Sequence, residues 1–342
     1  MTPIDDPCAR RNVLKGAGLC IGAGASLLSG LIPPAHAEAP SPPGLWSTEY
    51  WARKGDIPLY MFRKRLGAPR PGELPRPVLF LVHGSSVTWR IFDLDTPGRG
   101  DYSMMNKFAA WGFDVWTMDH ENYGRSGRTS GNSDIASGAQ DLKAAMEVVV
   151  RESGQPRAHF MGESSGALRA GLYAQIEPQR VDRLVLAAFT YKGTGSPTLK
   201  KRAEQLDLYR AHNMRKRDRA MIQSIFTRDK PGTTDPAVGD MLADAELKYG
   251  DQVPTGTYLD MTANLPIVDP TKLPAPVLLL RGEYDGIATV EDLFDFYRQL
   301  PNGDKQLVTL PQTAHSVAVA KNRELFWHAV REFLTMPAPI FI

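Results

Sequence analysis

Short apolar runs alternate with stretches of helical periodicity along most of this 342-residue chain. The run at residues 78–82 contains only Val, Leu and Phe, which is typical of a strand buried on both faces of a parallel sheet. The chain has further runs at 113–118, 159–161, 181–189, 277–280 and 306–310, and helical patterns at 103–111, 134–153, 167–176, 290–300 and 322–334. This alternation predicts an α/β fold whose mostly parallel central sheet is flanked by helices.

Two segments depart from the alternation. Residues 45–65 alternate polar and apolar side chains around Lys54-Gly55-Asp56, which predicts a β-hairpin. Residues 190–273 carry many charges on helical patterns and stand between two predicted strands. We therefore expect a core built from residues 45–189 and 274–342, with residues 190–273 inserted as a mainly helical cap or lid.

The first 37 residues have the order of an export signal. A basic stretch is followed by an apolar, Gly-rich run at residues 16–32 and by Ala35-x-Ala37, the small-residue pattern at which a signal peptidase cleaves. Arg10-Arg11 followed by x-Val-Leu-Lys resembles the twin-arginine (Tat) motif, which makes the Tat export machinery an expected partner. The apolar run is short for a transmembrane helix, so no stable membrane anchor is expected.

These features predict a bacterial protein that is periplasmic or secreted after cleavage near Ala37. Residues 38–44 contain several prolines and are interpreted as a linker. The two cysteines, Cys8 and Cys20, both precede the predicted cleavage site, so neither a disulfide framework nor a cysteine zinc site is expected in the body. A formal net charge of +2 gives no electrostatic footprint for nucleic acid.

The strongest chemical signal is Gly162-Glu163-Ser164-Ser165-Gly166, a G-x-S-x-G sequence between a predicted strand and a predicted helix. In such a turn the serine adopts a strained backbone conformation, and side chains at 162 and 166 would collide with neighbouring elements. The helix that follows favours negative charge at its start. The pentapeptide alone also fits a chance Gly/Ser turn, so the prediction of Ser164 as a nucleophile depends on its partners.

A serine hydroxyl needs a base, and the base needs an orienting acid. Asp285 and His315 follow two later strands, so they are expected at the same sheet edge as Ser164, in the order Ser, Asp, His. Glu283 and Asp292 are the rival acids. His328 lies in a helical pattern and is interpreted as a packing or surface residue.

The reaction also requires donors for the developing oxyanion. We predict the backbone N–H of Ser165, which follows the nucleophile, and that of Ser85, which follows the strand at 78–82. His83 could act chemically, but its place at a strand end before glycine favours a role in bracing this loop.

Together these residues make the chain resemble the α/β-hydrolase superfamily from about residue 45 onward. The resemblance rests on His83-Gly84, the turn at 162–166, Gly282-x-x-Asp285, Ala314-His315, and residues 119–126, which are similar to the D-x-x-G-x-G-x-S turn of that family. Asn122 replaces the usual glycine there, and asparagine tolerates a left-handed backbone. The resemblance implies Ser164 as nucleophile, His315 as general base and acid, and Asp285 as its orienting acid, with no metal and no organic cofactor.

Substrate preference is less constrained. Residues 190–230 hold 11 Lys/Arg against 4 Asp/Glu, which indicates either a solvated helix face or attraction of an anionic substrate. Trp89 and Phe92, in the loop after the predicted oxyanion donors, either line an apolar substrate pocket or pack in the core.

The sequence therefore predicts an exported serine hydrolase that cleaves a carboxylic ester through an acyl-enzyme. An amidase or peptidase, a lactonase and a C–C bond hydrolase remain alternatives on the same fold, because no residue distinguishes them. A non-catalytic binding protein is the alternative of another class, although it would have no need of serine, aspartate and histidine in this order.

Overall fold

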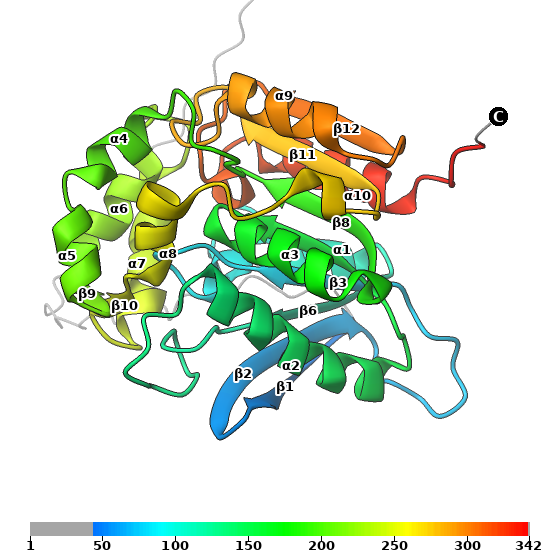
Figure 1. Ribbon diagram of the computed structural model, residues 1–342. Coiled ribbons are helices and arrows are strands. Elements are labelled where there is room, and N and C mark those ends of the chain that lie inside the picture. The colour runs from blue at the N-terminus through cyan, green and yellow to red at the C-terminus, as the bar shows by residue number, and fades with distance from the viewer. Residues whose placement is uncertain (1–43, 341–342) are drawn as a thin grey trace, which may run out of the picture. The chain divides into compact units, whose positions relative to one another are not determined.

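The computed structural model describes residues 44–340 (Figure 1). The predicted signal peptide and residues 38–43 of the predicted linker lie outside the described residues. Within residues 44–340, no helix combines the length and the apolar character that crossing a membrane requires.

A central sheet of eight strands organises the described chain, in the order β1-β2-β6-β3-β7-β8-β11-β12. All neighbouring strands from β6 to β12 pair in parallel, whereas β2 pairs antiparallel with both β1 and β6. The strands are β1 (Leu45–Lys54), β2 (Ile57–Leu66), β3 (Val78–Val82), β6 (Asp114–Met118), β7 (Ala158–Glu163), β8 (Val181–Ala187), β11 (Val277–Gly282) and β12 (Lys305–Leu310). The predicted hairpin and the predicted mostly parallel sheet are both confirmed.

Helices cover both faces of this sheet, as Figure 1 shows. They are α1 (Met104–Ala110), α2 (Ile135–Ser153), α3 (Ser165–Ile176), α9 (Val290–Gln299) and α10 (Arg323–Thr335). Local signals set their ends: the Ser103 and Asp134 side chains cap the first turns of α1 and α2, and Gly154 ends α2 at a φ of 72°.

The core forms two apolar layers, one on each sheet face. Strand β3 shows why: Phe80 and Val82 enter the layer that includes α2 and α3, while Leu79 and Leu81 enter the layer that includes α1 and α10. Because successive side chains of a strand point to opposite faces, a continuous apolar run is what a strand covered on both sides requires.

Residues 190–273 contain the elements that the sequence predicts as a cap, and Figure 1 shows these gathered at one end of the sheet. They are α4 (Pro197–Ala203), α5 (Leu206–Ala211), β9 (Met214–Lys216), α6 (Arg219–Thr227), α7 (Pro236–Leu247), β10 (Gln252–Pro254) and α8 (Gly256–Leu259). Short elements also occur in the loop after β3, namely the 3-10 helix η1 (Trp89–Phe92) and the strands β4 (Asp93–Leu94) and β5 (Tyr102–Ser103).

Candidate active site

Ser164 occupies the sharp turn between β7 and α3, with φ of 60° and ψ of −125°. This left-handed φ is rare for a residue with a side chain and costs energy that the surrounding structure must supply. Glycine is required on both sides: a Cβ on Gly162 would lie 2.3 Å from the Gly166 carbonyl oxygen, and one on Gly166 would lie 2.1 Å from the Val82 carbonyl oxygen. The collisions predicted from the sequence are therefore present.

The structure brings the three predicted partners together at the carboxyl ends of their strands. Ser164 Oγ lies 2.9 Å from His315 Nε2, and His315 Nδ1 lies 2.8 Å from Asp285 Oδ1. An ionised carboxylate only accepts hydrogen bonds, so Nδ1–H of the neutral ring donates to Asp285 and Nε2 accepts the Ser164 hydroxyl. This tautomer prepares Nε2 to take a proton from the serine.

The buried Asp285 is held in its ionised form. Burial alone would raise its pKa, but the electrostatic attraction to the His315 ring when that ring is protonated, the His315 hydrogen bond and the backbone N–H groups of Ala288 and Ile287 bring the pKa below its ordinary value. The backbone N–H groups of Ile287 and Ala288 donate to the same oxygen, Oδ1, at 2.8 and 3.0 Å. Asp285 therefore remains an anion that can stabilise a protonated His315.

The rival acids have other partners. Glu283 Oε2 accepts the backbone N–H of Gln312 at 2.8 Å. Asp292 accepts backbone N–H groups of the loop after β8, including that of Tyr191 at 2.7 Å. His328 is exposed and packs its ring against Trp111, 5.3 Å away. None of these three residues reaches His315.

The two residues predicted to supply oxyanion donors lie side by side. The Ser85 hydroxyl donates to Ser165 Oγ at 2.8 Å, which joins the loop after β3 to the start of α3. Within the described residues, neither backbone N–H finds an acceptor. Gly84 packs against the nucleophile, because a Cβ on Gly84 would lie 3.3 Å from Ser164 Cβ. The arrangement leaves both N–H groups free to bind a developing anion.

Two buried histidines brace this loop. His83 Nδ1 lies 2.8 Å from the Gly84 carbonyl oxygen, and His83 Nε2 accepts the backbone N–H of His120 at 3.3 Å. Burial lowers the pKa of both rings well below the ordinary value, so they are neutral. In the adjoining 119–126 turn, Asn122 has a φ of 65°, the left-handed conformation expected from its replacement of glycine.

The predicted role of Trp89 and Phe92 as pocket-lining residues needs correction. They are 1% and 0% exposed and lie in the core, and neither lines the cavities at the site. The prediction that they line a substrate pocket is therefore wrong, because η1 turns the ring of Trp89 onto Phe62, 4.5 Å away. The same turn brings the neighbouring Ile91 to the nucleophile.

Ser164 opens into a small chamber of about 40 Å³, called here the nucleophile chamber. Its apolar lining comes from Val87, Ile91 and Ile225, and its charged lining includes Arg202 and Arg228. Ile225, Arg202 and Arg228 belong to residues 190–273, so this inserted segment contributes directly to the walls around the nucleophile.

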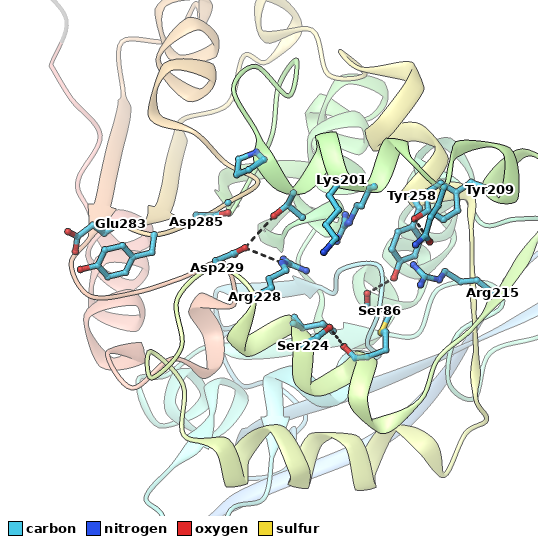
Figure 2. A pocket seen from close by; sticks show the side chains of 18 residues that line it. Ser86, Lys201, Tyr209, Arg215, Ser224, Arg228, Asp229, Tyr258, Glu283 and Asp285 are labelled. Carbon is cyan, nitrogen blue, oxygen red and sulfur yellow. Dashed lines mark hydrogen bonds and ion pairs between the residues drawn. The ribbon is translucent and has the colours of Figure 1, made fainter.

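A larger cavity of about 700 Å³, called here the cap cavity, shares Arg202 and Arg228 with the nucleophile chamber. Figure 2 shows Lys201 and Arg228 pointing toward each other in its middle. Glu283, Asp285 and Asp229 lie at one end of the view, and Arg215 with two tyrosines lies at the other. The sequence shows the positive charge of residues 190–230 but does not indicate which of these cations face the site.

Glu163, the variable residue of the turn, is a further feature that the sequence did not reveal. It is buried, and desolvation raises its pKa to about 8, with the nearby Asp285 charge adding to the shift. At neutral pH this carboxyl is therefore mostly protonated. Its position in the motif gives no signal of its burial.

One group of residues has the proximity of a metal site. An oxygen of Asp229, an oxygen of Asp285 and a nitrogen of His315 lie within 4.8 Å of one another. Both ring nitrogens of His315 already have hydrogen-bond partners, Asp285 and Ser164. A cation could bind the histidine only by breaking one of these bonds, so the donor set fits the hydrogen-bonded relay better than it fits a metal.

Comparisons with known proteins agree with this geometry. The family model Hydrolase_4, described as serine aminopeptidase, S33, matches residues 75–321. The AB hydrolase superfamily protein YisY of Bacillus subtilis (strain 168) is 25% identical over 256 residues, which cover 69% of this chain and 82% of the relative. The chain therefore belongs to the Hydrolase_4 family of α/β hydrolases and is a hydrolase.

Solved structures with the same fold are more distant in sequence. A thermophilic esterase from Thermogutta terrifontis is 18% identical with a TM-score of 0.63, covering 84% of this chain and 98% of that chain. E-2-(acetamidomethylene)succinate hydrolase is also 18% identical, with a TM-score of 0.62 and coverage of 84% and 99%. These likenesses establish the fold, and the resemblance to the α/β-hydrolase superfamily is confirmed.

Proposed function

We propose that this hydrolase cleaves a carboxylic ester through an acyl-enzyme intermediate. The observation that carries the proposal is the relay from Ser164 through His315 to Asp285, whose two links measure 2.9 and 2.8 Å. Both distances lie in the range that proton transfer between a nucleophile and its base requires.

In the first half-reaction, Ser164 Oγ bonds to the ester carbonyl carbon while its proton passes to His315 Nε2. The carbonyl π electrons move to oxygen, where the Ser85 and Ser165 N–H groups bind the anion. When the carbonyl re-forms, the alcohol leaves and takes the proton from His315. In the second half-reaction, water gives a proton to His315 and attacks the acyl-enzyme, and Ser164 leaves with that proton as the acid is released.

Hydrolysis of p-nitrophenyl butyrate by the purified protein tests this proposal. We expect turnover that falls by about 10⁴-fold or more in Ser164→Ala, and one organophosphonate bound per chain at Ser164. Ser47→Ala is the control, because Ser47 is an exposed serine on β1, outside the site, and its loss should leave the activity unchanged. Equal turnover in Ser164→Ala would refute the assignment of the nucleophile.

A second candidate follows from the family description, which names an aminopeptidase. Such an enzyme must bind the positive α-ammonium group of its substrate, and the cap cavity carries Lys201, Arg202 and Arg215 in the way of such a cation. This charge favours the ester proposal. Aminoacyl p-nitroanilides provide the direct test, and faster turnover of these than of esters would favour the aminopeptidase.

Lactonase and C–C bond hydrolase activities use the same relay and are tested with the same Ser164→Ala variant against a lactone and a β-diketone. The alternative of another class, a non-catalytic binding protein, is disfavoured by the family membership and by the complete relay. It predicts that the wild type and Ser164→Ala are equally inactive toward every member of such a panel.

We further propose export of the folded protein through the Tat pathway to the periplasm or beyond. Support comes from the sequence of residues 1–37, which holds the paired arginines and the Ala35-x-Ala37 pattern. Changing Arg10-Arg11 to Lys-Lys should leave the precursor in the cytoplasm of the producing bacterium. Unimpaired appearance of the shorter, cleaved protein outside the cytoplasm would refute the twin-arginine interpretation.

A further inference from the structure

The cap cavity is lined by positively charged side chains that lack nearby carboxylates. Lys201, Arg202 and Arg215 line it, and within residues 44–340 none of the three has a carboxylate oxygen within 4 Å. Arg228 is the exception among the cavity's cations, because its Nε lies 3.2 Å from Asp229 Oδ1. These three cations are therefore available to a ligand that residues 44–340 do not provide.

The acids of the same cavity, in contrast, already have partners. Asp285 binds His315. Glu283 accepts from Gln312, and Asp229 accepts from Thr198 Oγ1 at 3.3 Å as well as pairing with Arg228. The unpaired charge that faces the cavity is thus positive, and an anion is the ligand that complements it.

Arg202 is the unpaired cation that lies nearest to the nucleophile's surroundings. It lines both the cap cavity and the nucleophile chamber, so its guanidinium borders the space where the substrate must lie. Its guanidinium carbon lies 5.1 Å from the centre of the Tyr258 ring, and its hydrogen-bond contact is a weak one, 4.0 Å from Nη1 to the Met261 sulfur. A guanidinium has five N–H donors, and here they lack an oxygen acceptor among the described residues.

The positive charge of Arg202 is energetically unfavourable in its surroundings. Desolvation, followed by the repulsion of Arg228, lowers the pKa of Arg202 to about 10. At neutral pH the group is still protonated, so the structure holds a half-buried cation with an unfavourable environment that a neutral side chain of similar shape would avoid. An uncompensated charge beside a reacting group is more easily explained by a ligand than by stability.

Resting on the hydrolase function proposed above, we propose that Arg202 binds a free carboxylate of the substrate, with Arg228 and Lys201 beside it. The planar fork of a guanidinium fits the two oxygens of a carboxylate. The preferred substrates are then half-esters of dicarboxylic acids, or other esters that carry an anionic group a few bonds from the scissile carbonyl.

A matched pair of substrates tests this inference with the full chain. Monomethyl adipate and methyl hexanoate share a six-carbon acyl chain and differ in the terminal carboxylate. The wild type should hydrolyse the half-ester with at least a tenfold higher kcat/KM. In Arg202→Met the ratio of the two kcat/KM values should fall ten- to a hundredfold, mainly through KM, which is what the loss of a charge-assisted hydrogen bond predicts.

Arg210→Met is the matched control. Arg210 belongs to the same inserted segment, but its side chain is exposed, pairs with Asp207 and does not line either cavity. The substrate ratio should be unchanged in this variant. Arg202→Lys, which keeps the charge and loses the fork, should give an intermediate ratio.

Failure of this inference is distinguishable from failure of the ester proposal. A wild type that hydrolyses both esters equally, or an Arg202→Met variant that keeps the preference, overturns the carboxylate site and leaves the hydrolase standing. If no ester is hydrolysed, calorimetric titration with adipate decides independently: a tenfold or greater loss of affinity in Arg202→Met but not in Arg210→Met supports the site, and equal affinities overturn it. Unchanged circular dichroism in Arg202→Met would show that the variant is folded.

Discussion

The nucleophile chamber and the cap cavity differ in whether their charged side chains have partners of opposite charge. At the nucleophile the charged groups that act together are paired: Asp285 lies 2.8 Å from His315, and His315 lies 2.9 Å from Ser164. In the cap cavity of about 700 Å³, three cations have no carboxylate within 4 Å among residues 44–340, and one of them, Arg202, also borders the chamber. A relay that transfers protons must be complete before substrate arrives, whereas a recognition surface must leave its charge unpaired.

The relay and the unpaired cations come from different parts of the chain. Ser164, Asp285 and His315 follow strands of the central sheet, whose packed layers hold them in register. The unpaired cations belong to residues 190–273, in short helices and loops. On the proposals made above, the core would specify the reaction and residues 190–273 would select the substrate, a division that can be tested from either side.

The largest expected effect concerns two carboxylates that lie close to the same histidine. Asp285→Asn should lower kcat by about 10⁴-fold, because an amide cannot hold His315 in the tautomer that accepts the serine proton. Asp229→Asn, on the cavity side of the same cluster, should change kcat by less than about tenfold, because Asp229 binds Arg228 and Thr198 and makes no hydrogen bond to His315. Steady-state kinetics on p-nitrophenyl butyrate measures both, and similar losses in the two variants would remove the distinction between chamber and cavity.

The fold was largely predictable because its signals are local. Apolar runs such as residues 78–82 favour strands covered on both faces, and each predicted strand and helix of the core is present within a few residues of its predicted limits. Ser164, Asp285 and His315 could be selected for the same reason: strand ends of a parallel sheet meet at one edge, so residues distant in sequence could be placed together before any distance was known.

The rest of the site depends on contacts between residues that are distant in sequence, which no local sequence pattern predicts. Residues 190–230 show an excess of positive charge, but whether a given cation is paired depends on distant acids: Arg217 binds Glu246, while Arg202 finds no carboxylate partner in the described part of the chain. Trp89 and Ile91 are two positions apart, and only the turn of η1 decides that the smaller side chain faces the nucleophile.

A buried ion pair links the two regions and provides the next prediction. Arg217 Nη1 lies 2.8 Å from Glu246 Oε2 and donates to the Ser86 carbonyl oxygen, and Glu246 Oε1 accepts the backbone N–H of Thr88 at 2.7 Å. Arg217→Met leaves Glu246 buried without its cation, which should lower the free energy of unfolding by about 3–5 kcal/mol. Urea denaturation measures the loss.

Arg219→Met is the control for that variant. Its partners Asp240 and Asp244 have largely exposed side chains, so its removal should destabilise the protein far less than that of Arg217. The double variant Arg217→Met/Glu246→Gln should recover part of the lost stability, since no charge is then left buried. If the two arginine variants are equally stable, the pair does not hold the inserted segment to the oxyanion loop.

A smaller effect is expected from the close packing of Gly84 on Ser164. In Gly84→Ala the new Cβ would lie 3.2 Å from the Glu163 carbonyl oxygen and 3.3 Å from Ser164 Cβ, so the loop that carries the Ser85 N–H must shift. We expect kcat to fall by about 10²-fold, with little change in KM, as when one oxyanion donor is lost. In Gly131→Ala, at an exposed turn, the new Cβ would lie 3.2 Å from the side-chain oxygens of Glu121 and Thr129, which can adjust without a backbone shift. This variant should be close to wild type, and an equal loss there would point to general destabilisation.

The smallest effect concerns Glu163, the carboxyl that is buried beneath the nucleophile. Its pKa of about 8 in the folded protein exceeds the ordinary value of 4.5, so its contribution to stability is fully present below pH 4.5 and is lost as the pH rises toward 8. Glu163→Gln removes this dependence. Its Tm should therefore exceed that of the wild type by roughly 2–5 °C at pH 8, and the difference should shrink toward pH 5.

Thermal unfolding at pH 5, 6.5 and 8 measures that difference, and Glu283→Gln serves as the control because Glu283 lies at the cavity and accepts from the exposed Gln312. A pH-independent difference in Glu163→Gln would mean that the carboxyl is already ionised near neutrality. The nucleophile region would then hold two nearby anions, Glu163 and Asp285. Unpaired charge would in that case occur at the nucleophile as well as in the cap cavity, and the two regions would no longer differ in this respect.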